Sequence, residues 1–225
     1  MGEERPRRPA PERRFRIDPE HPLGGEMSEV LRGLGRRLQL TYLLEHHSSV
    51  PLLGLFSLIN GFLSIALMSL AALATRAPLV FPSLGPTAFL CFYTPTAPAA
   101  SPRNTVLGHL IGAAVGWLSL AAFGLLDQGP AVTTGVTWPR VLAAACSLGF
   151  TSGLMVWCRV PHPPAGATTL IISLGILREP WQVAVLMLAV VLLTVQAFLI
   201  NRLAGIPYPL WAPPKDGTPP VPPSS

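Results

Sequence analysis

The residue types most able to bind or react gather in two short segments rich in proline and glycine. The first reads FPSLGPTAFL (residues 81–90) and the second HPPAGATTLI (residues 162–171). A proline at a helix start fixes φ and lacks an N–H that the helix does not need. The N–H groups of the next turn can then face an anion, helped by the helix dipole. The predicted anion-binding residues are therefore Pro82, Ser83, Gly85 and Thr87 in the first segment and Pro163, Pro164, Gly166 and Thr168 in the second. The alternative is that both segments are tight loops that only reverse the chain.

Two histidines and an arginine stand close to these segments. His162 opens the second segment, and His109 lies early in the long uncharged run at residues 104–126. Arg103 and Asn104 stand at the start of that run and are further predicted substrate-binding residues. Ionisable groups inside a membrane are costly, so each is a functional candidate. Arg103 is predicted to attract an anion and either histidine to carry a proton during transport. The alternatives are an arginine that snorkels to the membrane surface and histidines hydrogen-bonded inside a helix bundle.

Composition restricts the protein class. Of 225 residues, 50% are hydrophobic and 12% charged, whereas soluble domains carry about 25% charged residues. Residues 1–49 hold nine arginines and eight acids, but residues 50–206 hold six arginines and two acids. Such a chain cannot cover a soluble surface with charge, so we expect an integral membrane protein in contact with lipid. Because acids nearly balance the N-terminal arginines, no nucleic-acid partner is expected.

Residues for hydrolysis or metal binding do not assemble into a known motif. Asp127 is the only acid between residues 50 and 177, and metalloprotease, serine hydrolase and phosphate-loop motifs do not occur. The three cysteines, Cys91, Cys146 and Cys158, lie in apolar stretches without disulfide or metal spacing. We therefore expect no enzyme activity, no cofactor and no metal.

Four uncharged runs are long enough to cross the hydrocarbon core, which takes about 20 apolar residues. They cover residues 50–75, 104–126, 141–158 and 180–201. Residues 77–102 and 160–177 are also uncharged but are broken by proline, and their apolar stretches, residues 88–93 and 167–177, are short for spanning helices. The predicted fold is an all-α membrane bundle of four long helices and two short broken elements, which are either re-entrant or spanning.

The two halves of this domain resemble each other. An offset of 81 residues aligns Pro82 with Pro163, Gly85 with Gly166 and Thr87 with Thr168. The same offset carries residues 51–75 onto 132–156 and residues 105–124 onto 186–205. This indicates an internal duplication, in which each half is a long helix, a broken element and a long helix. Broken elements at matching positions in two halves point to the binding site of a transporter.

The segments outside the transmembrane domain (residues 50–206) are polar or rich in proline. Residues 1–26 are predicted to be disordered, and residues 27–46 to form an amphipathic helix on the cytoplasmic membrane surface or against another subunit. Residues 207–225 contain eight prolines and are predicted to be a disordered tail.

Arginine distribution predicts the topology. The N-terminal arginines place that terminus in the cytoplasm, and both termini are cytoplasmic with four or with six crossings. With six crossings, the cytoplasmic side gains Arg103, Arg159, Arg202 and Lys215. With re-entrant elements, it keeps Arg140, Arg202 and Lys215. The positive-inside rule slightly favours six crossings, and the expected location is the plasma (inner) membrane.

Small residues recur at every fourth position in two of the runs, as Gly108, Gly112 and Gly116 and as Gly149 and Gly153. This spacing lets helices approach closely, either within the chain or between copies. A homo-oligomer is plausible because so few helices make a thin wall around a transport pathway.

The chain resembles the HPP family of integral membrane proteins, named for the motif that reads His162-Pro163-Pro164 here. FPSLGPTA, the SPRN…GH stretch (residues 101–109) and the INR…YPLW stretch (residues 200–211) are similar to family landmarks in the same order. Pro86 departs from the small residue expected there, and we expect no CBS-type domain of the kind that some members carry. Some members are nitrite transporters, so the resemblance implies transport of a small anion, with nitrite the leading substrate. The alternative is a non-transporting scaffold or sensor that recruits partners through its tails.

Overall fold

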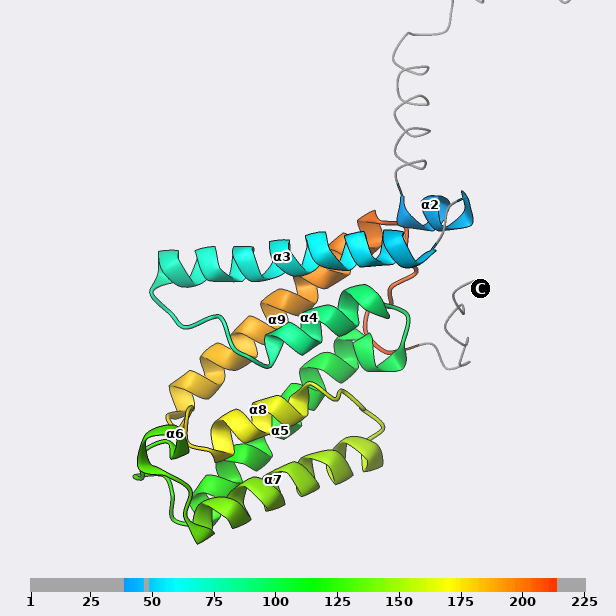
Figure 1. Cartoon of the computed structure of the whole chain (residues 1–225). Helices are drawn as coiled ribbons and strands as arrows, with labels where there is room; N and C mark the ends of the chain where they lie inside the picture. The colour runs from blue at the N-terminus through cyan, green and yellow to red at the C-terminus, as the bar shows by residue number, and fades with distance from the viewer. Residues whose placement is uncertain (1–38, 47–48, 214–225) are drawn as a thin grey trace, which may run out of the picture. The chain divides into compact units, whose positions relative to one another are not determined.

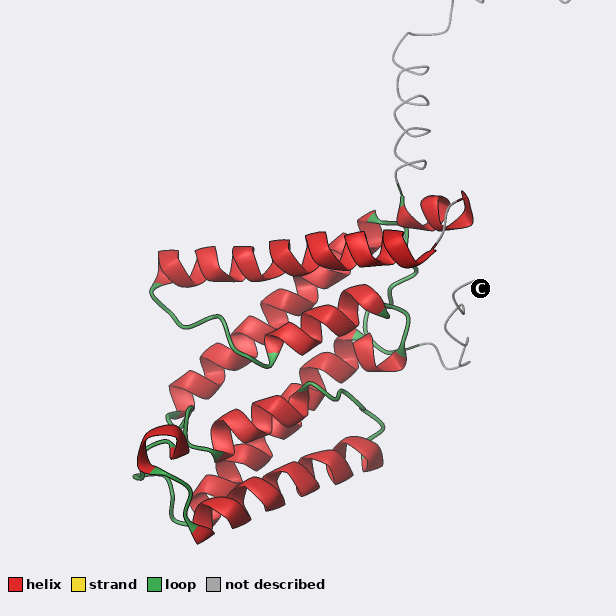
Figure 2. Ribbon diagram, in the orientation of Figure 1, coloured by secondary structure: helices red, strands yellow, loops and turns green. Residues whose placement is uncertain are grey.

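A computed structural model describes residues 39–46 and 49–213, and every regular element in this part of the chain is helical (Figures 1 and 2). The helices, in chain order, are α2 (Leu40–His46), α3 (Ser49–Thr75), α4 (Leu84–Tyr93), the 3₁₀ turn η1 (Pro98–Ala100), α5 (Pro102–Ala122), α6 (Ala131–Thr134), α7 (Trp138–Trp157), α8 (Ala165–Ser173) and α9 (Pro180–Leu203). The predicted tail at residues 1–26 and most of the predicted amphipathic helix lie outside the described residues, as do residues 214–225.

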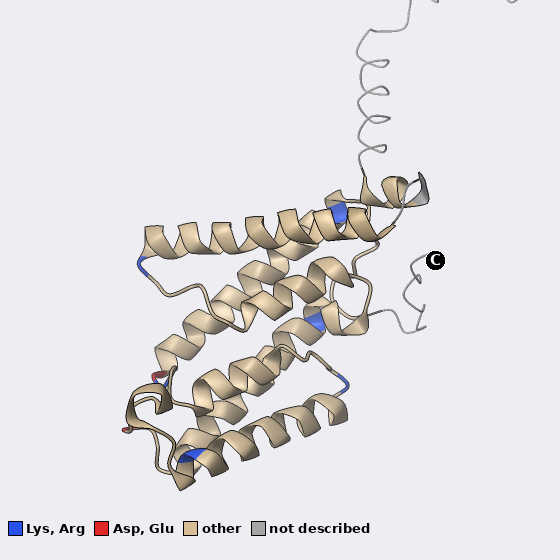
Figure 3. Ribbon diagram, in the orientation of Figure 1, with Lys and Arg blue, Asp and Glu red and all other residues tan. Residues whose placement is uncertain are grey.

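Four of these helices, α3, α5, α7 and α9, are long and apolar enough to cross a membrane. They confirm the four predicted long helices, with bounds that differ by a few residues at the ends. Lys and Arg lie at helix ends and connecting loops in Figure 3, and the lengths of the helices are free of charge. The chain is therefore a multi-pass integral membrane protein.

The two short helices, α4 and α8, follow non-helical segments at the same place in each half. In both halves the long first helix ends next to an arginine with positive φ, Arg76 at 54° and Arg159 at 56°. Non-helical residues then run to Ser83 and Pro164, the residues immediately before α4 and α8. Proline explains the break, because it removes a backbone donor and disfavours a helical conformation in the preceding residue.

Backbone hydrogen bonds define one end of the bundle, the η1 end. The N–H of Leu40 donates to the carbonyl of Ala204 (3.1 Å), and that of Arg103 donates to the carbonyl of Trp211 (3.0 Å). The starts of α2 and α5 and the end of α9 therefore lie together, and α3 begins at this end too, three residues after α2 (Figure 1). Because α3 and α5 both leave from this end, the segment before α4 and α4 itself must carry the chain back between them.

The opposite end, the α6 end, is joined by side chains. Arg140 at the start of α7 donates to the carbonyls of Gly129 (2.9 Å) and Ser173 (3.2 Å), and Arg178 donates to the carbonyl of Gln128 (2.7 Å). The end of α5 thus meets the starts of α7 and α9. The chain passes between the two ends four times as a long helix and twice as a non-helical segment followed by a short helix (Figure 1).

Helix contacts are repeated between the halves. Helix α3 packs on α4, and α7 packs in the same way on α8. Helix α5 packs on α8, and its counterpart α9 packs on α4. The pairs α3–α9 and α5–α7 correspond too. Each short helix therefore lies between the first helix of its own half and the last helix of the other.

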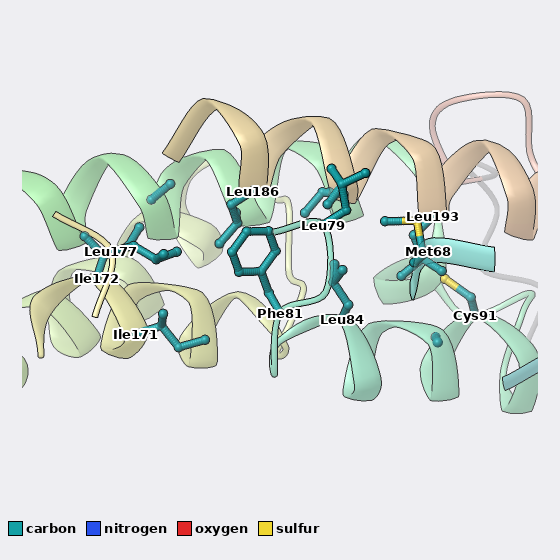
Figure 4. Packing of buried hydrophobic residues seen from close by; sticks show 14 of the residues in the cluster. Met68, Leu79, Phe81, Leu84, Cys91, Ile171, Ile172, Leu177, Leu186 and Leu193 are labelled. Carbon is teal, nitrogen blue, oxygen red and sulfur yellow. The ribbon is translucent and has the colours of Figure 1, made fainter. Parts of the chain in front are cut away.

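The apolar core lies between the short helices and their neighbours (Figure 4). Phe81 and Leu84 at the start of α4 pack near Leu186 of α9, while Cys91 lies further along α4 near Leu193. These residues are at most 5% exposed. By contrast, few residues of α3 are buried, so most of its surface is left for lipid.

The glycines of α5 bring its backbone against α8. A Cβ on Gly108 would lie 2.6 Å from Cβ of His162, one on Gly112 would lie 2.6 Å from the carbonyl oxygen of Ala165, and one on Gly116 would lie 2.8 Å from that of Thr169. The predicted close approach is therefore within the chain for this triplet. A Cβ on Gly149 of α7 would meet nothing within 4 Å.

Arg140 is 2% exposed and holds the α6 end through main-chain carbonyls alone. Replacing it by glutamine (Arg140→Gln) is expected to destabilise the fold by about 2 kcal/mol, because buried acceptors lose a charged donor. Thermal unfolding in detergent measures this loss. Arg159→Gln, at an exposed arginine, is the control and should unfold like the wild type; equal unfolding of both variants would remove Arg140 from this role.

Candidate functional site

Four buried polar side chains meet in the interior of the bundle, and we call them the Thr–His cluster. They are Thr87 in the first turn of α4, His109 in the second turn of α5, His162 in the segment before α8, and Thr168 in the first turn of α8. All four are 0% exposed. The starts of the two short helices therefore face one site, although their sequences are 81 residues apart.

His109 is the centre of the cluster. Its Nδ1 lies 2.7 Å from Oγ1 of Thr168, and its Nε2 lies 2.9 Å from Oγ1 of Thr87. The same Nε2 is 3.2 Å from Nε2 of His162, which is itself 3.4 Å from Oγ1 of Thr87. One imidazole on α5 thus links the corresponding threonines of both halves.

The partners of His162 fix its proton. Its Nδ1 lies 2.8 Å from the carbonyl oxygen of Ala99 in η1, and a carbonyl can only accept, so Nδ1 carries a hydrogen. In neutral His162 the Nε2 is then an acceptor, which requires the donor to be Nε2–H of His109. The remaining nitrogen of His109, Nδ1, accepts from the hydroxyl of Thr168.

The hydroxyl of Thr87 completes this arrangement. It lies 2.9 Å from the carbonyl of Ser83, to which it donates, so its oxygen lone pairs face the imidazoles. Every donor in the cluster therefore has an acceptor when both histidines are neutral. A proton added to His109 would convert its Nδ1 into a second donor, toward Oγ1 of Thr168, and the hydroxyl hydrogen of Thr168 would then have to turn to another acceptor.

The hydrogen-bond donors predicted to bind an anion at the starts of α4 and α8 differ in whether they already have an acceptor. At the start of α8, the N–H groups of Ala165, Gly166 and Ala167 already donate to the carbonyls of residues 162, 163 and 164, at 3.0 to 3.1 Å. At the start of α4, no hydrogen bond of the described residues uses the N–H of Gly85. The hydroxyl of Ser83, next to Thr87, is buried and has no partner. The free buried donor at the start of α4 is therefore the Ser83 hydroxyl, because Gly85 is exposed, and α8 also has an unpartnered buried hydroxyl, that of Thr169.

The other predicted residues surround the cluster rather than join it. Pro82 and Pro163 are exposed turn residues, Pro164 is the residue before α8, and Gly166 is half-buried. Arg103 is half-buried at the start of α5, six residues before His109 and so about 9 Å along the helix. Asn104 is 1% exposed and donates to the carbonyl of Pro98 in η1 (2.9 Å). The structure thus separates Arg103 and Asn104 from the two threonines.

Sequence reasoning gave no structural role to Tyr208 of the YPLW stretch, which contacts η1. Tyr208 is 0% exposed, and its hydroxyl donates to the carbonyl of Ala100 and lies 3.7 Å from Sγ of Cys91. Asn201 of α9 donates to the carbonyl of Cys91 (3.0 Å). The predicted disordered tail begins at residue 207, so Tyr208 falls within it; a tyrosine and tryptophan among prolines were the available signal for an ordered segment.

The two short helices begin at a shared buried polar site. The sequence motifs HPP and FPSLGPTA supply His162 and Thr87 to this site. A family model described as "HPP, transmembrane region" matches residues 48–209, which include all four members of the cluster. The chain belongs to the HPP family. The HPP region accounts for both short helices and for the segment that contains Tyr208.

Two curated relatives are transmembrane proteins of Dictyostelium discoideum. One is 30% identical over 159 residues, which are 68% of this chain and 52% of the relative. The other is 37% identical over 89 residues, which are 40% of this chain and 25% of the relative. The chain thus spans about half the length of the first relative and a quarter of the second. No solved structure is significantly similar to it.

Proposed function

We propose that this HPP family protein transports a small inorganic anion, with nitrite as the leading candidate, through a site at the starts of α4 and α8. The observation that carries the proposal is the Thr–His cluster, in which His109 binds Thr87 and Thr168 from opposite halves. Polar groups of this kind, buried between broken helices, are typical of transporter sites. The nitrite activity of some HPP family members favours that substrate.

Charge supports an anion rather than a cation. Among residues 49–213 the acids are Asp127 and Glu179, which lie in a turn and at the start of α9, near the α6 end. None of the carboxylates in residues 49–213 therefore neutralises a protonated histidine in the cluster. A monovalent anion would neutralise the protonated histidine. A proton and an anion that enter together therefore add no net charge to the apolar interior. The hydroxyls of Thr87, Thr168 and Ser83 would replace part of the hydration shell of the anion.

The proposal includes an inverted internal repeat that crosses the plasma membrane six times with both termini in the cytoplasm. Repeated helix contacts between the halves support the repeat. Three passes per half reverse the orientation of the second half, so that α4 and α8 run in opposite directions toward the two ends of the bundle. The arginines at the η1 end would then face the cytoplasm.

Uptake of nitrite into proteoliposomes that contain the purified full chain tests the substrate class. We expect saturable uptake, and we expect chloride, nitrate or formate to compete less well than unlabelled nitrite. Stronger competition by another of these anions would keep the transporter and replace the substrate. His162→Ala is expected to reduce uptake, because it removes the partner of His109 Nε2; unchanged uptake would remove His162 from the mechanism.

Removal of the tails distinguishes a transporter from the alternative function, a scaffold or sensor. Deletion of residues 1–38 and 214–225 leaves the described bundle from residue 39 to 213. A transporter keeps its uptake in this variant, whereas a scaffold loses its partners and shows no uptake before or after the deletion.

A further inference from the structure

The turn η1 presents three consecutive carbonyls, and each is taken by a side chain from a different part of the chain. Asn104 of α5 donates to Pro98 (2.9 Å), His162 donates to Ala99 (2.8 Å), and Tyr208 donates to Ala100. Ser101 adds a second donor to Pro98 (2.8 Å). The thiol of Cys91 also lies 3.9 Å from the carbonyl of Ala100, so side chains from several parts of the chain hold the carbonyls of this short turn.

Tyr208 belongs to the segment after α9, which is held across the η1 end. Ile206 donates through its N–H to the carbonyl of Asn201 (2.9 Å), and the carbonyl of Trp211 accepts from Arg103 (3.0 Å). Ile206 and Tyr208 are at most 7% exposed. We call residues 205–211 the C-terminal strap. It connects the end of α9 to η1 and to the start of α5.

Burial also keeps Tyr208 a donor. Its removal from water raises the pKa of the hydroxyl, because the anionic form would lose hydration. The hydroxyl therefore keeps its proton and donates a hydrogen bond to the carbonyl of Ala100, which can only accept one. This contact holds the last residue of η1, whereas Asn104 holds the first.

We propose that Tyr208 is a positioning residue for the Thr–His cluster: through η1, it fixes the carbonyl of Ala99 and thereby the proton and the orientation of His162. The hydrogen bond made by one imidazole nitrogen decides which nitrogen carries the proton. With Nδ1–H of His162 held on Ala99, its Nε2 is an acceptor aimed at His109. If η1 shifts, the proton of His162 is free to move to Nε2, where it would meet Nε2–H of His109.

The tautomer of His162 is the direct readout. Nitrogen-15 NMR of the full chain, with labelled histidine in nanodiscs, distinguishes Nδ1–H from Nε2–H, and His162→Gln identifies the signal of His162. In the wild type we expect the Nδ1–H form. In Tyr208→Phe, which keeps the ring and removes the hydroxyl, we expect loss of Nδ1–H as the dominant form. Tyr93→Phe, at an exposed tyrosine that stacks on Phe89, is the matched control and should leave the signal unchanged.

Cys91 reports whether the strap stays in place. Its thiol is buried beside the Tyr208 hydroxyl, and in a Cys146→Ser/Cys158→Ser background it is the only thiol available for alkylation. If Cys91 remains protected in Tyr208→Phe, an altered tautomer is due to the lost hydroxyl and supports the proposal. If Cys91 becomes reactive, the strap has moved. An altered tautomer of His162 then supports a positioning role of the strap, to which Tyr208 belongs.

An unchanged Nδ1–H signal of His162 overturns the proposal whether Cys91 is protected or reactive, because η1 would then hold the histidine without Tyr208. The readout concerns the imidazole itself. It therefore separates this role of Tyr208 from the identity of the transported anion.

Discussion

Replacing the central histidine, His109→Ala, is expected to reduce nitrite uptake by roughly 100-fold or more, the range in which removal of a positioned proton-transfer group falls. His109 makes contacts of 2.7 Å and 2.9 Å with Thr168 and Thr87, and one of 3.2 Å with His162. Its removal deprives both helix starts of their common partner and interrupts the path of a proton between the halves. Initial rates in proteoliposomes measure the effect.

A matched control exists in the other half of the repeat. Val190 of α9 is at the position 81 residues after His109 and is also 0% exposed. Val190→Ala removes buried volume without a polar group, so it should lower stability slightly and keep most of the uptake. If His109→Ala folds and transports at the wild-type rate, the cluster is a structural feature of the bundle and not the transport site.

The second large effect is expected in the contact between α5 and α8. Gly112→Ala places a Cβ 2.6 Å from the carbonyl oxygen of Ala165, and a backbone atom cannot move aside as a side chain does. Overpacking of this kind destabilises by about 1–3 kcal/mol. Because α8 also carries Thr168, its displacement should lengthen the contact with His109 and lower uptake together with stability.

Gly149→Ala is the control for that variant. Nothing lies within 4 Å of the Cβ it would add, and alanine is the better helix former by up to about 1 kcal/mol. Its thermal midpoint in detergent should equal or exceed that of the wild type, while that of Gly112→Ala should fall. A Gly112→Ala protein as stable and active as Gly149→Ala would contradict the close packing of α5 on α8.

The long helices were predictable because each is a continuous uncharged run of at least about 20 residues, a length that the membrane itself dictates. The predicted run at residues 180–201 corresponds to α9 (Pro180–Leu203), for example. The short helices were located less well: α4 begins at Leu84, whereas the apolar stretch suggested Ala88. Proline and glycine mark where a helix is broken, but they do not say at which residue the next one starts.

The site was predicted in composition but not in geometry. Thr87, Thr168 and the two histidines stood out as polar residues in apolar surroundings, yet their contacts join residues 22 to 75 positions apart. Such distances depend on how α4, α5 and α8 pack. Arg103 shared a motif with Asn104 and His109, but six helical residues separate it from His109. Tyr208 was missed because a proline-rich sequence outside the last span resembles a tail until its burial is known.

The central claim, that the Thr–His cluster moves an anion together with a proton, is tested most directly by nitrite uptake into proteoliposomes with and without an imposed pH gradient. We predict saturable uptake that increases when the outside is more acidic, since one proton and one anion would enter together. Uptake at the same rate with and without the pH gradient would contradict the proton linkage. No flux of nitrite, nitrate, formate or chloride, from protein shown to be folded, would contradict transport itself.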